Sequence, residues 1–140
     1  MSIPRHLRLE FVTPERAIAH EDVDEVELPG EEGFFGVLPG HAPLLAALRP
    51  GEMWYRKGTE TTHAFLGGGF AEVTPERVSI LAPVAERAED IDLARAEAAK
   101  RRAEERLARP AADVDFERAR IALLRAISRL DVAKARRRRS

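Results

Sequence analysis

The distribution of glycine and proline changes abruptly near residue 87 of this 140-residue chain, and this change constrains the fold more than any single motif. All nine glycines and eight of the nine prolines lie before Ala85, as do all aromatic residues except Phe116. Glycine and proline bound short strands and turns, whereas the rest of the chain is rich in alanine and arginine. We therefore expect a β domain over residues 1–87 and a helical domain over residues 88–140.

The first part shows the alternation that half-buried strands produce. Leu7, Leu9 and Phe11 alternate with charged residues, and Val26 and Leu28 do the same further on. Turn residues separate these runs. The spacing is typical of an antiparallel sandwich or barrel, and we predict an antiparallel β-sandwich. Its further strands are expected at residues 34–38, 53–56, 63–66, 70–73 and 78–81.

The second part has the period of a helix. Asp90 or Asp92 is placed to cap a first helix that runs to about Leu107, and Asp113 or Asp115 to cap a second. Apolar residues recur at spacings of three and four on both segments, which predicts an antiparallel α-helical hairpin. The facing residues would be Ala96, Ala99, Ala103 and Leu107 on the first helix and Phe116, Ala119, Leu123, Ile127 and Leu130 on the second.

The contact between these helices is expected to be weak because its first face is mostly alanine. Burial of a methyl group contributes roughly 0.8 kcal/mol, against about 1.5 to 3 kcal/mol for a leucine or phenylalanine side chain. One hypothesis is that the hairpin separates and extends, since each helix holds its own backbone hydrogen bonds. The alternative is a permanently folded hairpin.

Composition excludes several classes of protein. No run approaches the roughly 18 to 20 apolar residues of a membrane span, and the start of the chain lacks the apolar core of a secretory signal, so we expect a cytoplasmic location. There is no cysteine, hence no disulfide or thiolate chemistry. Residues 1–87 carry eight Lys/Arg and fourteen Asp/Glu, a balance of −6, whereas residues 88–140 carry fifteen and ten, a balance of +5. The basic part either meets an acidic partner or forms a solvated helix.

The segment from residue 33 to 45, GFFGVLPGHAPLL, combines large apolar side chains with three glycines and two prolines. Such a loop has a fixed backbone path and presents a surface. Its one ionisable side chain, His41, has no acid or cysteine beside it, which favours a docking edge over an active site. Phe34 and Phe35 either form a covered interface, or one ring lies in the sandwich core.

Other familiar sites are excluded by their missing residues. Gly67 to Gly69 precede no Lys-Ser/Thr pair, so they form a bend into a strand rather than a phosphate-binding loop. The four histidines lack metal-ligand spacing, and no serine has a nucleophile context. Arg136 to Arg139 attract phosphates, yet no aromatic residue is interleaved for base stacking, which argues against nucleic acid.

Charged residues of the two helices form one cluster of interest. Asp92 and Arg95 are three apart and can form a local ion pair, which is usually structural. Arg125 and Arg129 are four apart on the second helix, and Arg102 lies on the first. A closed hairpin would gather these guanidinium groups, which then need a counter-anion, and a triphosphate is one.

Three blocks of the sequence together resemble one protein family. They are the loop at residues 33–45, the run LGGGFAEV at residues 66–73 and the run EDIDLARA at residues 89–96. In this order, from about Leu7 to Leu130, the chain resembles the epsilon subunits of bacterial F-type ATP synthases. One departure is Phe34, where many members of the family have Glu.

The resemblance implies partners. In the family the sandwich binds the gamma subunit and the membrane rotor c-ring, so Phe34, Phe35 and His41 become docking candidates. Basic residues of the carboxyl-terminal helices meet an acidic segment of the catalytic beta subunits in the alpha–beta head. The matching candidates here are Arg118, Arg120, Arg125, Arg129 and Lys134.

The resemblance also implies a ligand. ATP-binding members use a set of residues that this chain supplies as Glu86, Asp92, Arg95, Ala96, Arg102, Arg125 and Arg129. ATP would be a regulatory ligand, with no catalytic cofactor.

The predicted function is that of a non-catalytic central-stalk subunit at the cytoplasmic face of the cell membrane, which couples proton translocation to ATP synthesis and inhibits ATP hydrolysis through its hairpin. The alternatives are a purely structural coupling subunit and, more remotely, a nucleic-acid adaptor.

Overall fold

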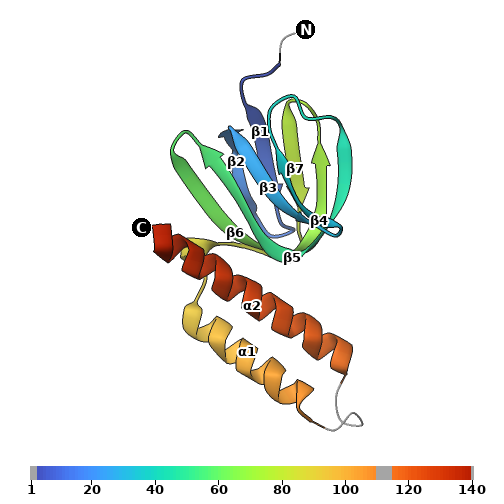
Figure 1. The fold of residues 1–140 in the computed structure, drawn as a ribbon, viewed down its shortest axis with the longest axis vertical. Helices are drawn as coiled ribbons and strands as arrows, with labels where there is room; N and C mark the ends of the chain where they lie inside the picture. Colours follow the sequence, from blue (N-terminus) through green and yellow to red (C-terminus); the bar gives the residue numbers. More distant parts are fainter. Residues whose placement is uncertain (1–2, 110–114, 140) are drawn as a thin grey trace.

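The computed structural model describes residues 3–109 and 115–139. It confirms the predicted order, in which a β-sandwich precedes two helices that lie against one end of it (Figure 1). The elements are β1 (Leu7–Val12), β2 (Ala17–Val23), β3 (Glu25–Gly30), β4 (Gly33–Val37), β5 (Leu44–Lys57), β6 (Glu60–Val73), β7 (Arg77–Leu81), β8 (Ala85–Arg87), a 3-10 turn (Ala88–Asp90), α1 (Leu93–Leu107) and α2 (Phe116–Arg139).

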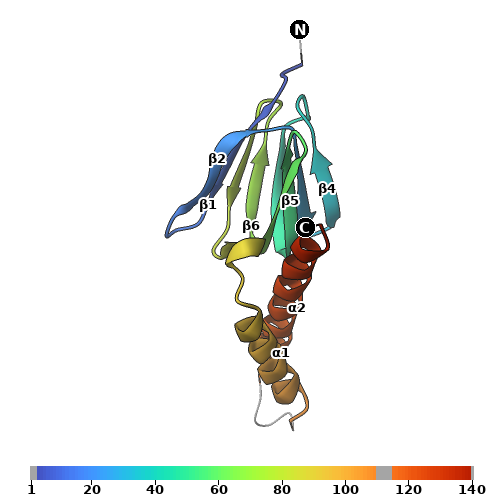
Figure 2. The same ribbon diagram turned by 90° about the vertical axis from the view of Figure 1, so that its left-hand side faces the viewer.

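The strands pair in the order β2-β1-β7-β6-β5-β3-β4, with β8 added to β6. Seen from the side, they form two facing layers above the helices (Figure 2). The expectation of an antiparallel sandwich is correct for every pair but one, because β1 and β7 run parallel. The chain forms β2 to β6 before it adds β7 beside β1. The parallel strands β1 and β7 are therefore joined by a long connection and not by a hairpin.

Strands β5 and β6 are longer than predicted, at 14 residues each. The sequence pattern divides β6 at its glycines, but the pairing with β5 continues on both sides of them, from Leu44 opposite Val73 to Lys57 opposite Glu60. Gly69 has a φ of +119°, and a Cβ there would lie 2.3 Å from the Leu81 carbonyl oxygen. Glycine therefore bends one continuous strand instead of ending it.

The core of the sandwich consists of large side chains that are fully buried, among them Leu9, Phe11, Leu28 and Met53. A second apolar cluster joins the sandwich to the helices. It contains Phe65 of β6 together with Ala88, Ile91, Ala96, Leu130, Val132 and Ala133. Because α2 lies against β5 and β6 and α1 lies against α2, the hairpin is closed and docked.

The predicted apolar stripe of α2 is partly wrong. Phe116 and Ile127 are 39% and 37% exposed, whereas Ala126 and Ala133 are buried beside the predicted Ala119 and Leu130. The buried alanines Ala119, Ala126 and Ala133 recur every seven residues, whereas Phe116 and Ile127 are displaced to the margin of the buried face. Close approach of two helices requires small residues at the contact, which spacing alone does not reveal.

Each helix begins with an aspartate whose carboxylate caps it. Asp92 caps α1, because its carboxylate accepts a hydrogen bond from the Arg95 amide at 3.1 Å, whereas Asp90 belongs to the preceding 3-10 turn. The Asp115 carboxylate accepts from the Arg118 amide at 3.1 Å. The other candidate cap of α2, Asp113, lies outside the described residues.

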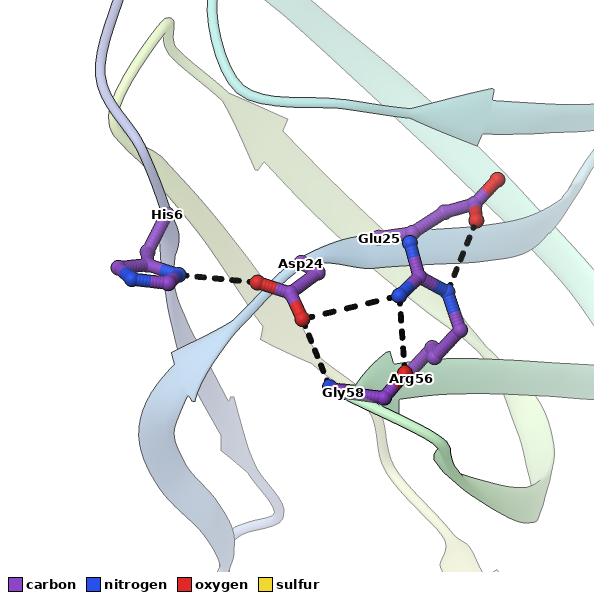
Figure 3. A network of polar contacts seen from close by, with 5 residues as sticks. All are labelled: His6, Asp24, Glu25, Arg56 and Gly58. Carbon is purple, nitrogen blue, oxygen red and sulfur yellow. Dashed lines mark hydrogen bonds and ion pairs between the residues drawn. The ribbon is translucent and has the colours of Figure 1, made fainter.

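A polar network fastens the β5–β6 turn to the start of β3 (Figure 3). The Asp24 carboxylate accepts a hydrogen bond from the Gly58 amide at 2.7 Å and lies 2.9 Å from His6 Nδ1. Arg56 reaches Glu25 at 3.4 Å and donates to the Gly58 carbonyl at 3.0 Å. The Gly58 amide and then His6 hold the pKa of Asp24 below its usual value of 3.8.

Candidate functional site

A cavity of about 680 Å³ opens where the hairpin meets the sandwich. The β1–β2 turn, the β7–β8 connection, the start of α1 and one residue of α2 surround it. Its volume falls within the range of about 300–1,000 Å³ that is usual for small-molecule sites. Six of the seven residues predicted to bind nucleotide line it, namely Glu86, Asp92, Arg95, Ala96, Arg102 and Arg129.

The seventh residue, Arg125, is exposed on α2 and does not line the cavity. It lies one helical turn before Arg129, which displaces it by about 6 Å along the helix axis. A contact between Arg125 and a ligand in this cavity would require its long side chain to reach back toward Arg129. Its role in binding stays a prediction.

Arg129 is held in place by two contacts. Its Nε donates to Glu86 Oε1 at 2.6 Å, and its guanidinium lies over the Phe65 ring at 4.6 Å from the centroid. Glu86 is on β8 and Phe65 on β6, so both contacts join α2 to the sandwich. The ion pair is half-buried, which makes it stronger than an exposed pair of the same geometry.

The expected ion pair between Asp92 and Arg95 is not formed. The Asp92 carboxylate instead caps α1 through the backbone amide of Arg95, which leaves the guanidinium available. Arg95 and Arg102 are exposed at the cavity, and neither forms an ion pair within residues 3–109 and 115–139. Two unpaired guanidinium groups that line one cavity are suited to a polyanion with several oxygen acceptors.

Apart from Glu86, the residues by which the sandwich lines the cavity were not predicted from the sequence. Thr13, Glu15 and Arg16 of the β1–β2 turn line it, as do Val84 and Asp90. In the sequence, Thr-Pro-Glu-Arg is an ordinary turn some 70 residues before the hairpin. No local signal connects the two. Among the described residues, no group of His, Cys, Asp or Glu could hold a metal ion.

The predicted docking loop has an apolar surface. Phe34 is 55% exposed beneath the Arg49 guanidinium, which lies 5.1 Å from its centroid, whereas Phe35 packs against the sandwich core. Leu45 is 73% exposed beside them. The His41 amide donates to the Leu38 carbonyl at 3.1 Å, which closes the turn after β4. The partly buried Phe35 ring thus packs against the core, and the exposed Phe34 ring is available to a partner.

The basic residues predicted to meet the catalytic head lie on the surface of α2. Arg118, Arg120 and Lys134 are all exposed. Arg120 pairs with Glu117 on the preceding turn. The side chains of Arg136 to Arg139 lie outside the described part of the chain. No helix within the described residues is both long enough and apolar enough to cross a membrane.

Two family models match the chain. Residues 6–88 match the β-sandwich domain of the ATP synthase delta/epsilon chain, and residues 89–134 match its long α-helix domain. Curated relatives named ATP synthase epsilon chain include one from Nitratidesulfovibrio vulgaris (strain DP4), 52% identical over 91% of this chain and 96% of the relative. Another, from Solibacter usitatus (strain Ellin6076), is 47% identical over 94% and 98%.

A solved structure agrees with these relatives. A chain of the Euglena gracilis mitochondrial ATP synthase, in an assembly described as OSCP, F1 and c-ring, superposes with a TM-score of 0.82 at 27% identity, over 91% of this chain and 81% of that one. A chain of the Tetrahymena thermophila central stalk and c-ring shares the fold, with a TM-score of 0.53 at 13% identity over 64% and 72% of the two chains. The chain therefore belongs to the ATP synthase delta/epsilon family, as an epsilon-type, non-catalytic subunit of the central stalk.

Proposed function

We propose that the hairpin of this subunit is an ATP sensor that controls ATP hydrolysis by the synthase. The observation that carries the proposal is the cavity between the helices and the sandwich, which six of the seven expected nucleotide residues line. The cavity exists only while the hairpin is closed, because α1, α2 and the sandwich each supply part of its wall. A ligand that fills it must favour the closed state.

The residues that line the cavity are suited to a nucleoside triphosphate. Arg95 and Arg102 offer forked donors that match phosphate oxygens two at a time. Ala96 is 4% exposed, and its small side chain leaves room for a flat base beside α1. In this proposal ATP bound in the cavity acts as a signal and not as a substrate.

The proposed mechanism is a population shift between two hairpin states. ATP at a hundred times its dissociation constant stabilises the closed state by about 2.7 kcal/mol, which is enough to reverse a weak preference. Without ATP, the hairpin separates and extends into the catalytic head of alpha and beta subunits. There Arg118, Arg120 and Lys134 would meet acidic side chains and oppose hydrolysis.

The sandwich performs the coupling role in this proposal. It binds the gamma subunit and the c-ring through the docking loop, with Phe34 as an apolar contact and His41 nearby, and so transmits rotation driven by proton flow. The apolar exposure of Phe34 and Leu45 supports a covered surface. In this proposal the subunit is a peripheral component at the cytoplasmic face of the cell membrane.

A second candidate is a stalk subunit that couples rotation without sensing nucleotide. The Glu86–Arg129 ion pair favours it, because this pair and the contact of Arg129 with Phe65 hold α2 to the sandwich without any ligand. In that case the cavity would hold only water, and the hairpin would stay closed at all ATP concentrations.

Calorimetric titration of the full-length chain with ATP and then ADP distinguishes the two. We expect saturable ATP binding that Arg95→Ala and Arg102→Ala each weaken by about ten- to a hundredfold, the loss of one charge-assisted contact. Arg101→Ala is the matched control, because Arg101 is equally exposed on α1 but does not line the cavity. Arg125→Ala tests whether that residue participates. The absence of saturable heat at millimolar ATP would rule out sensing by the free subunit.

A further inference from the structure

The sandwich contributes its own arginine to the cavity. Arg16, at the end of the β1–β2 turn, lines it opposite the helices. Of the sandwich residues that line the cavity in the described part of the chain, Arg16 alone is cationic. Its guanidinium is exposed and forms no ion pair with any described residue. A third guanidinium group thus lines the cavity with Arg95 and Arg102, and it forms no ion pair with Glu15 or Asp90, the acids nearest to it in the cavity wall.

The turn that carries Arg16 is held closed by several hydrogen bonds. The Thr13 amide donates to the Arg16 carbonyl at 2.9 Å, and the Arg16 amide donates to Thr13 Oγ1 at 3.2 Å. Pro14 fixes one φ angle between them. The backbone at Arg16 is therefore fixed before any ligand arrives, and binding has to order only the side chain.

Arg16 also lies beside a second, smaller cavity. This cavity of about 130 Å³ shares Arg16 and Asp90 with the large one and is completed by Ala17, Ile18 and Arg87. The Arg87 guanidinium donates to the Ile18 carbonyl, but its buried Nε has no hydrogen-bond partner among the described residues. The volume suffices for a phosphate group or a few waters, since one water occupies about 30 Å³.

We propose that Arg16 is a further ligand-binding residue of this site, which contacts the phosphate groups of a bound polyphosphate. The inference rests on the proposed function and extends it from the hairpin to the sandwich. A ligand held by Arg95 and Arg102 on α1 and by Arg16 on the sandwich bridges the two domains.

This bridge explains why binding and closure are coupled. A ligand shifts a conformational equilibrium only by the difference between its affinities for the two states. If the ligand contacted only the hairpin, its affinity would be nearly the same for a closed hairpin that is docked on the sandwich and for one that has detached. The contact with Arg16 exists only when α1 is docked, because α1 and the turn belong to different domains. Arg16 therefore contributes directly to the differential affinity.

Titration of the full-length chain with ATP and, separately, with inorganic tripolyphosphate tests the proposal. Arg16→Ala should weaken both ligands by about tenfold or more, and Arg16→Lys by less, since a lysine keeps the charge without the fork. Glu15→Gln should strengthen both ligands, because it removes an acid of the same turn from the cavity wall. Arg5→Ala is the control, since Arg5 is an exposed cation of the same domain that does not line the cavity.

The outcomes separate this inference from the proposed function. If the wild-type chain binds ATP and Arg16→Ala binds it equally well, Arg16 has no part in the site, although ATP sensing stands. If Arg16→Ala weakens ATP but not tripolyphosphate, the phosphate contact is refuted. If the wild-type chain binds neither ligand, the proposed function fails and this inference with it. A normal circular dichroism spectrum and melting temperature for Arg16→Ala confirm that the variant is folded, and Glu15→Gln tests the same charge effect independently.

Discussion

The sandwich and the hairpin are stabilised by side chains of very different size. Leu7, Leu9, Phe11, Leu28 and Met53 are completely buried in the sandwich. The buried residues of α1 are instead the alanines Ala96 and Ala103, and those of α2 include Ala119, Ala126 and Ala133 beside Leu130 and Val132. Each alanine contributes about a third of what a large apolar side chain does.

From this difference we expect the hairpin to open at a lower free energy than the sandwich. Regions with few buried apolar contacts open at a smaller free energy than the core, and the parts that move in regulation are drawn from them. In the proposed function the hairpin is such a region, and a few kilocalories per mole of ligand binding favour its closed state. Substitutions in either region test this difference.

The largest expected effect is in the sandwich core. Phe11→Ala should lower the free energy of unfolding by about 3 to 5 kcal/mol, through lost apolar burial and the cavity left behind. Urea denaturation followed by circular dichroism measures it. Leu81→Ala is the control, because Leu81 is 55% exposed and its removal should cost less than about 0.5 kcal/mol. Equal losses in the two variants would contradict the assigned core.

Enlarging an alanine should disturb the hairpin alone. Ala103 is 2% exposed, so Ala103→Leu forces α1 away from α2 at a cost of about 1 to 3 kcal/mol. We expect faster proteolysis and hydrogen exchange in α1 and α2 with unchanged exchange in the strands. Ala94→Leu, at an exposed position of the same helix, should have no such effect. If the strands of Ala103→Leu destabilise equally, the two regions are not independent.

Breaking the ion pair between Glu86 and Arg129, which joins the hairpin to the sandwich, should have an intermediate effect on stability. A double-mutant cycle of Glu86→Gln and Arg129→Gln measures the coupling across the 2.6 Å ion pair, and we expect about 1 kcal/mol, more than exposed pairs give. Proteolysis of the hairpin is the readout. Arg120→Gln with Glu117→Gln serves as an exposed reference pair within α2. A coupling energy near zero would mean that Phe65 and the apolar cluster alone hold α2.

The smallest effect concerns the acid response of the sandwich. The pKa of Asp24 is lowered by the Gly58 amide and by His6, so its stabilising contribution is complete above its ordinary pKa of 3.8 and is lost as the pH falls through the lower value in the folded state. Asp24→Asn should therefore reduce stability near pH 7 and flatten the decline below about pH 4. Urea midpoints between pH 7 and pH 2 test this, with Glu60→Gln of the same turn as control. Parallel curves for Asp24→Asn and the wild type would refute it.

Local patterns predicted those parts of the fold that local physics decides. The alternation of Leu7, Leu9 and Phe11 located β1, and Asp92 was one of two candidate caps for α1. The continuity of β6 through Gly68 and Gly69 was missed, because whether a glycine bends or ends a strand depends on the strand beside it. Likewise, Ala126 replaced Ile127 at the helix contact, because tertiary packing selects the small side chain.

The candidate site could be predicted only in part, for the same reason. The residues of the hairpin and β8 follow from a resemblance in sequence, and six of them converge on one cavity. Arg16 carries no such signal, because it is distant in sequence and reaches the cavity only through the fold of β1 and β2. Arg125 shows the converse, since this residue of the expected set does not line the cavity.

In the proposed function, ATP bound in the cavity holds the hairpin against the sandwich. Hydrogen exchange of the full-length chain, measured by mass spectrometry over increasing ATP concentration, tests it most directly. The claim predicts that exchange in α1 and α2 slows by about a hundredfold when ATP is at a hundred times its dissociation constant, whereas exchange in the core strands is unchanged. Identical exchange in both helices with and without saturating ATP would contradict it.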